Sequence, residues 1–242
     1  MATDSQKSFQ TMNALIVVLA LATEYHSIVI TATWRKERLQ NAQELCKTLN
    51  SSCEILPAIN ARKNSVKAKL IHQHILEPNT NLKPGQIGCI ASHVKAYHQA
   101  LKSNYDLFLI LEDDASLLED FKTQIQVKFL PNLNKYKWDV FHLRPSDWCS
   151  KNWLKKAFYR WLPIGNNMYR ELSVPWSGFT STIGLFTTRL GLEKILATFP
   201  ISQAIDLHIG NLLKKKKLNV YTTCPPLVID KMFASSINNK TV

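Results

Sequence analysis

The sequence predicts an α/β fold, and three observations carry this prediction. The chain has 242 residues, 45% of them hydrophobic, which is enough for one sizeable domain with or without a small appendage. Residues 27–32 (SIVITA) form a run rich in β-branched side chains, followed by helical spacing over residues 34–50. This order opens a βα unit. A second apolar run, residues 107–111, is short enough for a buried strand.

The other elements follow in chain order. Residues 14–22 are apolar but too short to span a bilayer, and we expect a buried or membrane-associated element rather than a cleaved signal. Residues 53–59 are predicted as the second strand. A Lys-Pro-Gly turn at 83–85 introduces a helix over 86–103, and a further helix is predicted at 207–213. No GxGxxG or GxxxxGK[ST] motif occurs, which excludes a Rossmann fingerprint and a P-loop.

The charge is unevenly distributed. Residues 1–121 hold 12 basic and 12 acidic side chains, so the whole net charge of +12 lies in residues 122–242. A half this basic could meet nucleic acid, an anionic membrane face or an anionic acceptor, although the Lys214–Lys217 run alone fits a solvated helix face.

The five cysteines are scattered, without a CxxC pair and with an odd total. This pattern argues against a disulfide framework or a zinc site, and it fits a reducing compartment.

Three adjacent carboxylates, Glu112, Asp113 and Asp114, end the apolar strand. Their repulsion is relieved when a divalent cation or a cationic group neutralises them. Because alternate residues of an extended chain point the same way, Glu112 and Asp114 can converge while Asp113 faces elsewhere. Oxygen ligands suit Mg²⁺ or Mn²⁺. The same triplet also fits an acidic helix start, which complements the helix dipole.

Two motifs together resemble glycosyltransferase family 25, which includes bacterial lipooligosaccharide galactosyltransferases and the related collagen galactosyltransferases. They are PGQIGCIASH at residues 84–93 and LILEDDA at residues 109–115. The resemblance extends loosely over residues 27–230. Gln86 stands where the family usually has an acid, and the SGFTSTIGLFTT segment at 177–188 lacks the family's usual tyrosine. On this basis we expect residues 1–26 to be an extension, residues 27–235 one family 25 domain, and residues 236–242 a polar tail.

The resemblance implies a GT-A-like fold, a mixed and mainly parallel sheet flanked by helices, with a nucleotide-sugar at the strands' carboxyl ends. It implies a donor such as UDP-galactose, with glucose as an alternative sugar, and a Mn²⁺ or Mg²⁺ ion at Glu112 and Asp114. Asp113 is then expected to orient the sugar or a nearby arginine. An open α/β sheet independently favours a ligand in that crevice.

The remaining candidate residues have more general roles. Arg38 follows the first strand, where its guanidinium could meet a phosphate or a carboxylate. The resemblance places Ser92 and His93 on the nucleotide or metal side of the pocket, although a single histidine on a packed helix is more often structural. Transfer with inversion also needs a base for the acceptor hydroxyl, for which Asp206 is the first candidate and Asp139 the second. Asp206 equally fits a helix N-cap.

The expected acceptor is an anionic glycolipid or glycan such as lipooligosaccharide, held by the basic second half at an anionic membrane. This places the protein in the cytoplasm, peripheral to the inner membrane face, with secretory entry through residues 14–22 as an alternative. No nucleic acid is expected. Two other functions stay open, a metal-dependent phosphoester hydrolase and a basic membrane or nucleic-acid binding module with a vestigial pocket.

Overall fold

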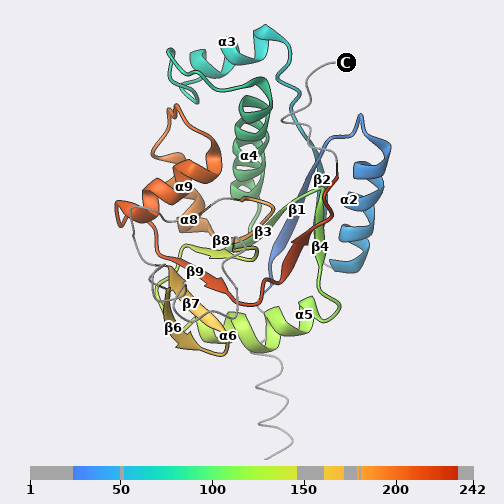
Figure 1. Cartoon of the computed structure of the whole chain (residues 1–242), viewed down its shortest axis with the longest axis vertical. Helices are drawn as coiled ribbons and strands as arrows, with labels where there is room; N and C mark the ends of the chain where they lie inside the picture. The colour runs from blue at the N-terminus through green and yellow to red at the C-terminus, as the bar shows by residue number, and fades with distance from the viewer. Residues whose placement is uncertain (1–23, 50–51, 146–160, 172–178, 180, 234–242) are drawn as a thin grey trace, which may run out of the picture.

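The computed structural model describes residues 24–49, 52–145, 161–171, 179 and 181–233. These residues form an eight-stranded sheet and a separate two-stranded sheet, with helices on both sides of the larger one (Figure 1). The strands are β1 His26–Thr31, β2 Cys53–Pro57, β3 Leu107–Glu112, β4 Ala115–Leu117, β5 Val140–His142, β6 Trp161–Gly165, β7 Met168–Glu171, β8 Gly184–Thr188, β9 Val220–Thr223 and β10 Val228–Asp230. The helices are α2 Lys36–Leu49, α3 Asn64–His72, α4 Pro84–Lys102, α5 Phe121–Thr123, the π-helix η1 Gln124–Phe129, α6 Leu130–Leu133, α8 Arg189–Leu196 and α9 Ile205–Lys214.

The larger sheet is mixed and mainly parallel, which confirms the predicted fold class. Its strand order in the described part of the chain is β2-β1-β3-β8-β5-β9-β7-β6. Strands β1, β2 and β3 are parallel, and so are β5 and β9, whereas β8 and β7 run antiparallel to their neighbours. The carboxyl ends of β1 and β3 therefore lie side by side, because Ile30 pairs with Glu112.

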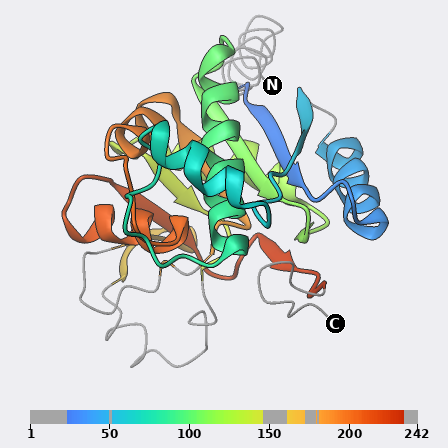
Figure 2. The same cartoon turned by 90° about the horizontal axis from the view of Figure 1, so that it is seen from above.

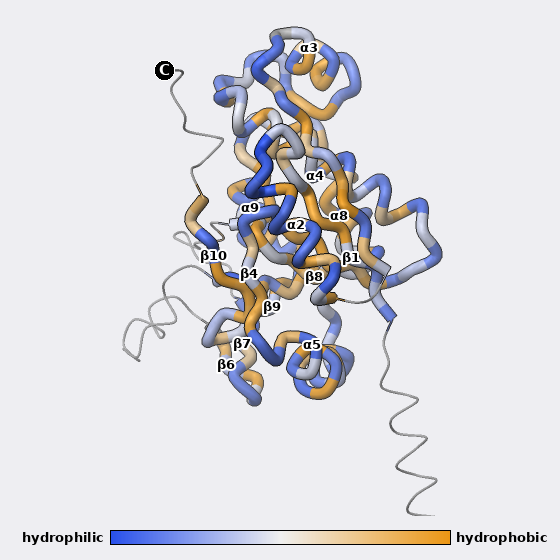
Figure 3. The backbone as a smooth tube through the Cα atoms, turned by 90° about the vertical axis from the view of Figure 1, so that its right-hand side faces the viewer, coloured by the Kyte–Doolittle hydropathy of each residue, from blue (hydrophilic) through white to orange (hydrophobic). Residues whose placement is uncertain are grey.

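Strand alternation divides the core between the two faces of the sheet. Ile28 and Ile110 point to the face that α4, α8 and α9 cover, whereas Val29 and Leu109 point to the face covered by α2, η1 and α6. Figure 2 shows helices on both sides of the sheet, and Figure 3 shows hydrophobic residues along the central strands. The layers hold the strand ends in fixed positions, which is what a site at that edge requires.

The prediction that the cysteines do not form disulfides was wrong. Cys46 and Cys53 form a disulfide, and Cys224 is also disulfide-bonded. Cys46 lies in the last turns of α2 and Cys53 begins β2, so the short connection brings their Cα atoms to 5.4 Å. The scattered spacing concealed a pair that the βα turn brings together, and the inference of a reducing compartment loses its basis.

Two expectations concern residues outside the described part of the chain, the apolar segment 14–22 and the polar tail 236–242. Among the residues that are described, no helix combines the length and the apolar character needed to cross a membrane.

Candidate active site

The acidic triplet lies where β3 ends and turns into β4. The helix-start interpretation of the triplet is wrong, because β4 and not a helix follows it. Asp113 is buried, and its Oδ2 accepts a hydrogen bond from the Ala32 backbone N–H at 2.6 Å. The parallel pairing of β1 with β3 thus joins the carboxylate turn to the first βα turn.

Arg38 is the buried cation that neutralises part of the triplet. Its guanidinium, in the first turns of α2, donates to Asp113 and, at 3.2 Å, to Asp114 Oδ2. Asn41, one turn further along α2, donates to the backbone carbonyls of Asp113 and Ala115 at 2.7 and 2.9 Å. The sequence suggested a phosphate or a carboxylate as the partner of Arg38, and in the structure Arg38 contacts the carboxylates of Asp113 and Asp114.

The motif at the start of α4 docks the helix through two residues one turn apart. A side chain at Gly88 would place its Cβ 2.6 Å from the Ile59 carbonyl oxygen, so only glycine allows this close approach. The Ser92 hydroxyl donates to the Gly88 carbonyl at 2.6 Å and accepts from the Ile59 N–H at 2.8 Å. Ser92 is thus occupied in fixing α4 against the segment after β2.

Two other residues of the same motif face the end of β3. His93 is buried, and its Nε2 lies 3.2 Å from Glu112 Oε1, which also accepts from the Thr182 hydroxyl at 2.6 Å. Cys89 lies one turn earlier on α4, and the donor atoms of Cys89, His93 and Glu112 all lie within 4.8 Å of one another. Sulfur, nitrogen and oxygen donors therefore converge at the strand end.

The three carboxylates have different electrostatic environments. Burial favours the neutral form of Glu112, but hydrogen bonds from His93 and Thr182 outweigh this effect and lower its pKa below its usual value. Burial, followed by the negative charge of Glu112, raises the pKa of Asp114 to about 7. Asp114 is therefore the member of the triplet whose charge is least compensated.

The residues at this end of β3 fit a divalent cation. Asp114 Oδ1 is buried and has no hydrogen-bond partner among the described residues. An ionised carboxylate so placed is unfavourable unless a positive charge lies next to it, and Arg38 reaches the other oxygen. Glu112 and Asp114 would supply oxygen ligands of the kind that Mg²⁺ and Mn²⁺ take.

A pocket of about 230 Å³ opens beside this cluster, at the carboxyl ends of β1 and β3. Its walls come from the turn after β1, the segment after β2, the start of α4 and the end of β3. Their side chains mix an exposed aromatic ring, cations and carboxylates, and those relevant here are Trp34, Arg35, Asn60, Arg62, His93 and Glu112. The pocket occupies the crevice expected for an α/β sheet.

The two candidate bases lie in different places. Asp206 lies in the first turn of α9, where burial, with a contribution from the charge of Glu112, raises its pKa. The N-cap position belongs to Ala204, so Asp206 does not cap the helix. Asp139 precedes β5, at the amino end of that strand and away from the carboxyl end of β3, and there Lys194 and the Asn219 N–H bind its carboxylate at 2.6 and 2.8 Å. The structure therefore brings Asp206, and not Asp139, near the triplet.

Sequence reasoning missed Cys89, Thr182 and the pocket residue Trp34. Cys89 and His93 are four residues apart on one helix face, a spacing that could have revealed the pair. The contact between Thr182 and Glu112 joins residues 70 positions apart, and no local signal predicts it.

The fold and this site together define an enzyme-like α/β protein with a polar ligand pocket at an acidic strand end. Residues 25–159, more than half of the chain, match the model of glycosyltransferase family 25, described as LPS biosynthesis protein. The chain belongs to that family.

One curated relative supports the match. A Haemophilus influenzae protein named "Putative glycosyltransferase" is 28% identical over 106 residues. The aligned region covers 43% of this chain and 38% of that relative, so the chain spans about two fifths of the relative's length.

Three solved structures illustrate the similarity in fold, which is distant. Inositol-1-phosphate CTP transferase from T. maritima gives a TM-score of 0.41 at 10% identity, covering 87% of this chain and 91% of that one. Mannose-1-phosphate geranyltransferase from Thermus thermophilus gives 0.38 at 14% identity, covering 83% and 73%. Mouse xyloside xylosyltransferase 1 gives 0.36 at 7%, covering 81% and 83%. With TM-scores this low, the family assignment rests on the sequence match alone.

Proposed function

We propose that this protein is a metal-assisted glycosyltransferase that transfers a hexose from a UDP-sugar to a glycan acceptor. Membership of family 25 supports glycosyl transfer. The observation that carries the proposal is the acidic end of β3, which faces a pocket that also presents arginines and an aromatic ring. A nucleoside diphosphate needs both kinds of partner, because its base stacks and its phosphates bind cations.

The donor side of the pocket is the turn after β1 and the segment after β2. Trp34 is half exposed and offers a ring face for the base. Arg35 and Arg62 line the same pocket and offer guanidinium groups to the diphosphate. UDP-galactose is the proposed donor, with UDP-glucose as the competing one, because the family alone indicates galactose.

Glu112 and Asp114 are proposed to hold a divalent cation beside the diphosphate. Such a cation, when bound, stabilises the charge of the departing nucleoside diphosphate. Asp113 does not join them as a ligand in this proposal, since Arg38 and the Ala32 N–H already bind its two oxygens. Its role is to fix the turn that carries Asp114.

Asp206 is proposed as the base that takes the proton of the acceptor hydroxyl in an inverting transfer. Burial raises the pKa of Asp206, which makes its carboxylate a better proton acceptor than an ordinary aspartate. Asp139 has no part in this proposal, because it binds Lys194 and the chain before β9.

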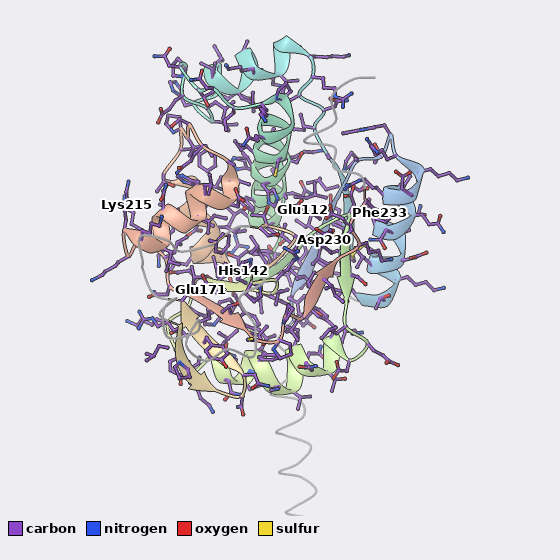
Figure 4. All side chains as sticks on the ribbon, in the orientation of Figure 1. Glu112, His142, Glu171, Lys215, Asp230 and Phe233 are labelled. Atoms are coloured by element: carbon purple, nitrogen blue, oxygen red, sulfur yellow. A yellow bond between two sulfur atoms is a disulfide. The ribbon has the colours of Figure 1, made fainter. Side chains whose placement is uncertain are left out.

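An anionic glycolipid or glycan, such as lipooligosaccharide, is the proposed acceptor. Lys215, Lys216 and Lys217 are exposed at the end of α9, and Figure 4 shows Lys215 at the periphery, away from Glu112. These lysines are proposed to contact an anionic membrane surface, at roughly 1 kcal/mol each. In this proposed arrangement the lysines contact the membrane surface, and the pocket is left open to the acceptor.

The test is a thermal-shift panel of UDP-galactose, UDP-glucose and UDP with Mn²⁺, Mg²⁺ or EDTA. At a donor concentration of about 100 times Kd the stabilisation is about 2.7 kcal/mol, which for a chain of this size raises Tm by roughly 5–10 °C. We expect this rise with a UDP-sugar and Mn²⁺, and its loss with EDTA or in Asp114→Asn.

The matched control is Asp120→Asn, which removes an exposed carboxylate that binds only Gln124 among the described residues. It should respond to donor as the wild type does. Retention of a metal-dependent shift and of donor turnover in Asp114→Asn would show that the metal assignment is wrong. Turnover of phosphoesters without any sugar acceptor would instead favour a hydrolase.

A further inference from the structure

Three donor atoms of different chemistry meet at the end of β3. Cys89 and His93 lie one turn apart on α4, and with Glu112 they place sulfur, nitrogen and oxygen atoms within 4.8 Å of one another. Cys89 is a free cysteine, unlike the disulfide-bonded Cys46, Cys53 and Cys224. Cys89, His93 and Glu112 also line the pocket, so an ion can reach them from solvent.

The spacing is close to that of a coordination shell. With bond lengths of about 2.0–2.3 Å, tetrahedral ligand atoms lie about 3.4–3.8 Å apart. Two donor atoms at the 4.8 Å limit would need to approach by roughly 1 Å, which side-chain rotation on a helix and at a strand end can supply. The backbone of α4 is already fixed by Gly88 and Ser92 against the segment after β2.

Two observations favour a metal-ligand role for these side chains over a purely structural one. His93 is 1% exposed, and its Nδ1 has no hydrogen-bond partner within the described part of the chain. A buried imidazole normally uses both nitrogens, so this ring has unused binding capacity. The Thr182 hydroxyl holds Glu112 Oε1 at 2.6 Å, as groups behind a ligating carboxylate commonly do.

The charges around the cluster also favour a cation. Burial raises the pKa of the Cys89 thiol, and the negative charges of Glu112 and Asp206 raise it further. The same two charges attract a positive ion, which would in turn favour the thiolate form that binds it.

We infer that Cys89, His93 and Glu112 form a metal site with a borderline-soft preference, taking Zn²⁺ or Co²⁺ more tightly than Mg²⁺. A thiolate and an imidazole select such ions, whereas an oxygen-only set suits Mg²⁺. The inference rests on the proposed function in one respect, because Glu112 would belong to the site of the donor's cation. It adds Cys89 and His93 to the ligands of that cation.

The experiment is a Co²⁺ titration of the metal-free 242-residue chain, without donor, followed by absorption in the near ultraviolet and visible range. A cobalt–thiolate bond gives a charge-transfer band that oxygen and nitrogen ligands do not give. We expect one Co²⁺ per chain with this band, and displacement of Co²⁺ by Zn²⁺ but not by an equal concentration of Mg²⁺. In Cys89→Ser the band should disappear, and Zn²⁺ affinity should fall at least about 10-fold.

His93→Gln should weaken Co²⁺ binding similarly, whereas His98→Gln is the matched control. His98 is exposed on the same helix, five residues further along, and its replacement should leave the titration unchanged. Circular dichroism and Tm verify that each variant is folded. If a variant fails to fold, the presence or absence of the thiolate band in the wild type still tests the inference.

Any one of three results would overturn the inference. These results are no Co²⁺ binding, Co²⁺ binding without the thiolate band, and a thiolate band that survives in Cys89→Ser. The second result would place the ion on oxygen ligands and leave the proposed function intact. Failure of the proposed function would appear separately, as the absence of a donor-dependent thermal shift with Mn²⁺.

Discussion

Arg38 offers the sharpest test of how the acidic turn is held together. Its side chain is 6% exposed and shares its guanidinium between Asp113, which is 5% exposed, and Asp114, which is 19% exposed. Methionine has a similar length and is apolar, so Arg38→Met removes the charge while keeping much of the packing. The change leaves two carboxylates without their common cation.

The expected loss of folding stability follows from the burial of the ion pair. Removing one partner of a buried ion pair typically costs about 3–5 kcal/mol, because the remaining charge has neither water nor a counterion. Asp113 keeps the Ala32 N–H as a donor, so we expect a value near the lower end of that range, about 3 kcal/mol. Urea denaturation followed by circular dichroism would show this as a fall of about 1–2 M in the midpoint.

Arg35→Met is the matched control, three residues earlier in the chain. Arg35 is partly exposed and lies 3.8 Å from an exposed Glu37, so its loss should change the unfolding free energy by no more than about 0.5 kcal/mol. Adding Asp113→Asn to Arg38→Met should restore part of the stability, since a neutral amide needs no counterion. A loss below about 1 kcal/mol for Arg38→Met, or an equal loss for both arginines, would refute the reasoning.

Three further predictions concern stability. Gly88→Ala should cost about 1–3 kcal/mol in urea denaturation, because the new Cβ would lie 2.6 Å from the Ile59 carbonyl oxygen, and an unchanged midpoint would contradict the close approach. Replacing both Cys46 and Cys53 with serine should lower the free energy of unfolding by about 2–3 kcal/mol for a loop with a sequence separation of 7, measured against the oxidised wild type. Burial, followed by the charge of Lys215, lowers the pKa of His208 to about 4. Since the unfolded chain binds this proton more readily, stability should rise between about pH 4 and 6.5 and then level off. After allowance for partial solvent screening we expect a rise of about 1–2 kcal/mol, and His208→Gln should abolish that part of the pH dependence.

Local sequence patterns predicted the order and kind of the elements well. The strand expected at residues 27–32 is β1, and the run at 107–111 is β3 with Glu112 added. The helix expected at 86–103 is α4, shifted by two residues at its start. These elements have strong apolar periodicity or β-branched composition, so the chain itself carries the signal. The β6–β7 hairpin and the short β4–β10 sheet have no comparable pattern, and they were not predicted.

The candidate site was predictable only where neighbours in sequence are neighbours in space. The triplet at residues 112–114 is contiguous, and the resemblance of residues 84–93 to family 25 identified the adjoining helix. By contrast, Thr182, just before β8, donates to Glu112 from 70 residues away, and Lys231 binds Asn41 across 190 residues. The distance of Asp139 from the triplet could not be read from the sequence either, because Asp139 lies just before the start of β5 whereas the triplet lies at the end of β3.

The environments of the three carboxylates explain why the triplet favours a ligand site over a charged surface turn. A surface turn would leave all three side chains in water, but here each one meets a different part of the fold. Glu112 binds the His93 ring and the Thr182 hydroxyl. Asp113 accepts hydrogen bonds from the Arg38 guanidinium and the Ala32 backbone N–H. Asp114 keeps one buried oxygen without a partner among the described residues, and burial with the charge of Glu112 raises its pKa to about 7. A fold that compensates two adjacent carboxylates closely and leaves the third short of positive charge has room for one more cation at that point.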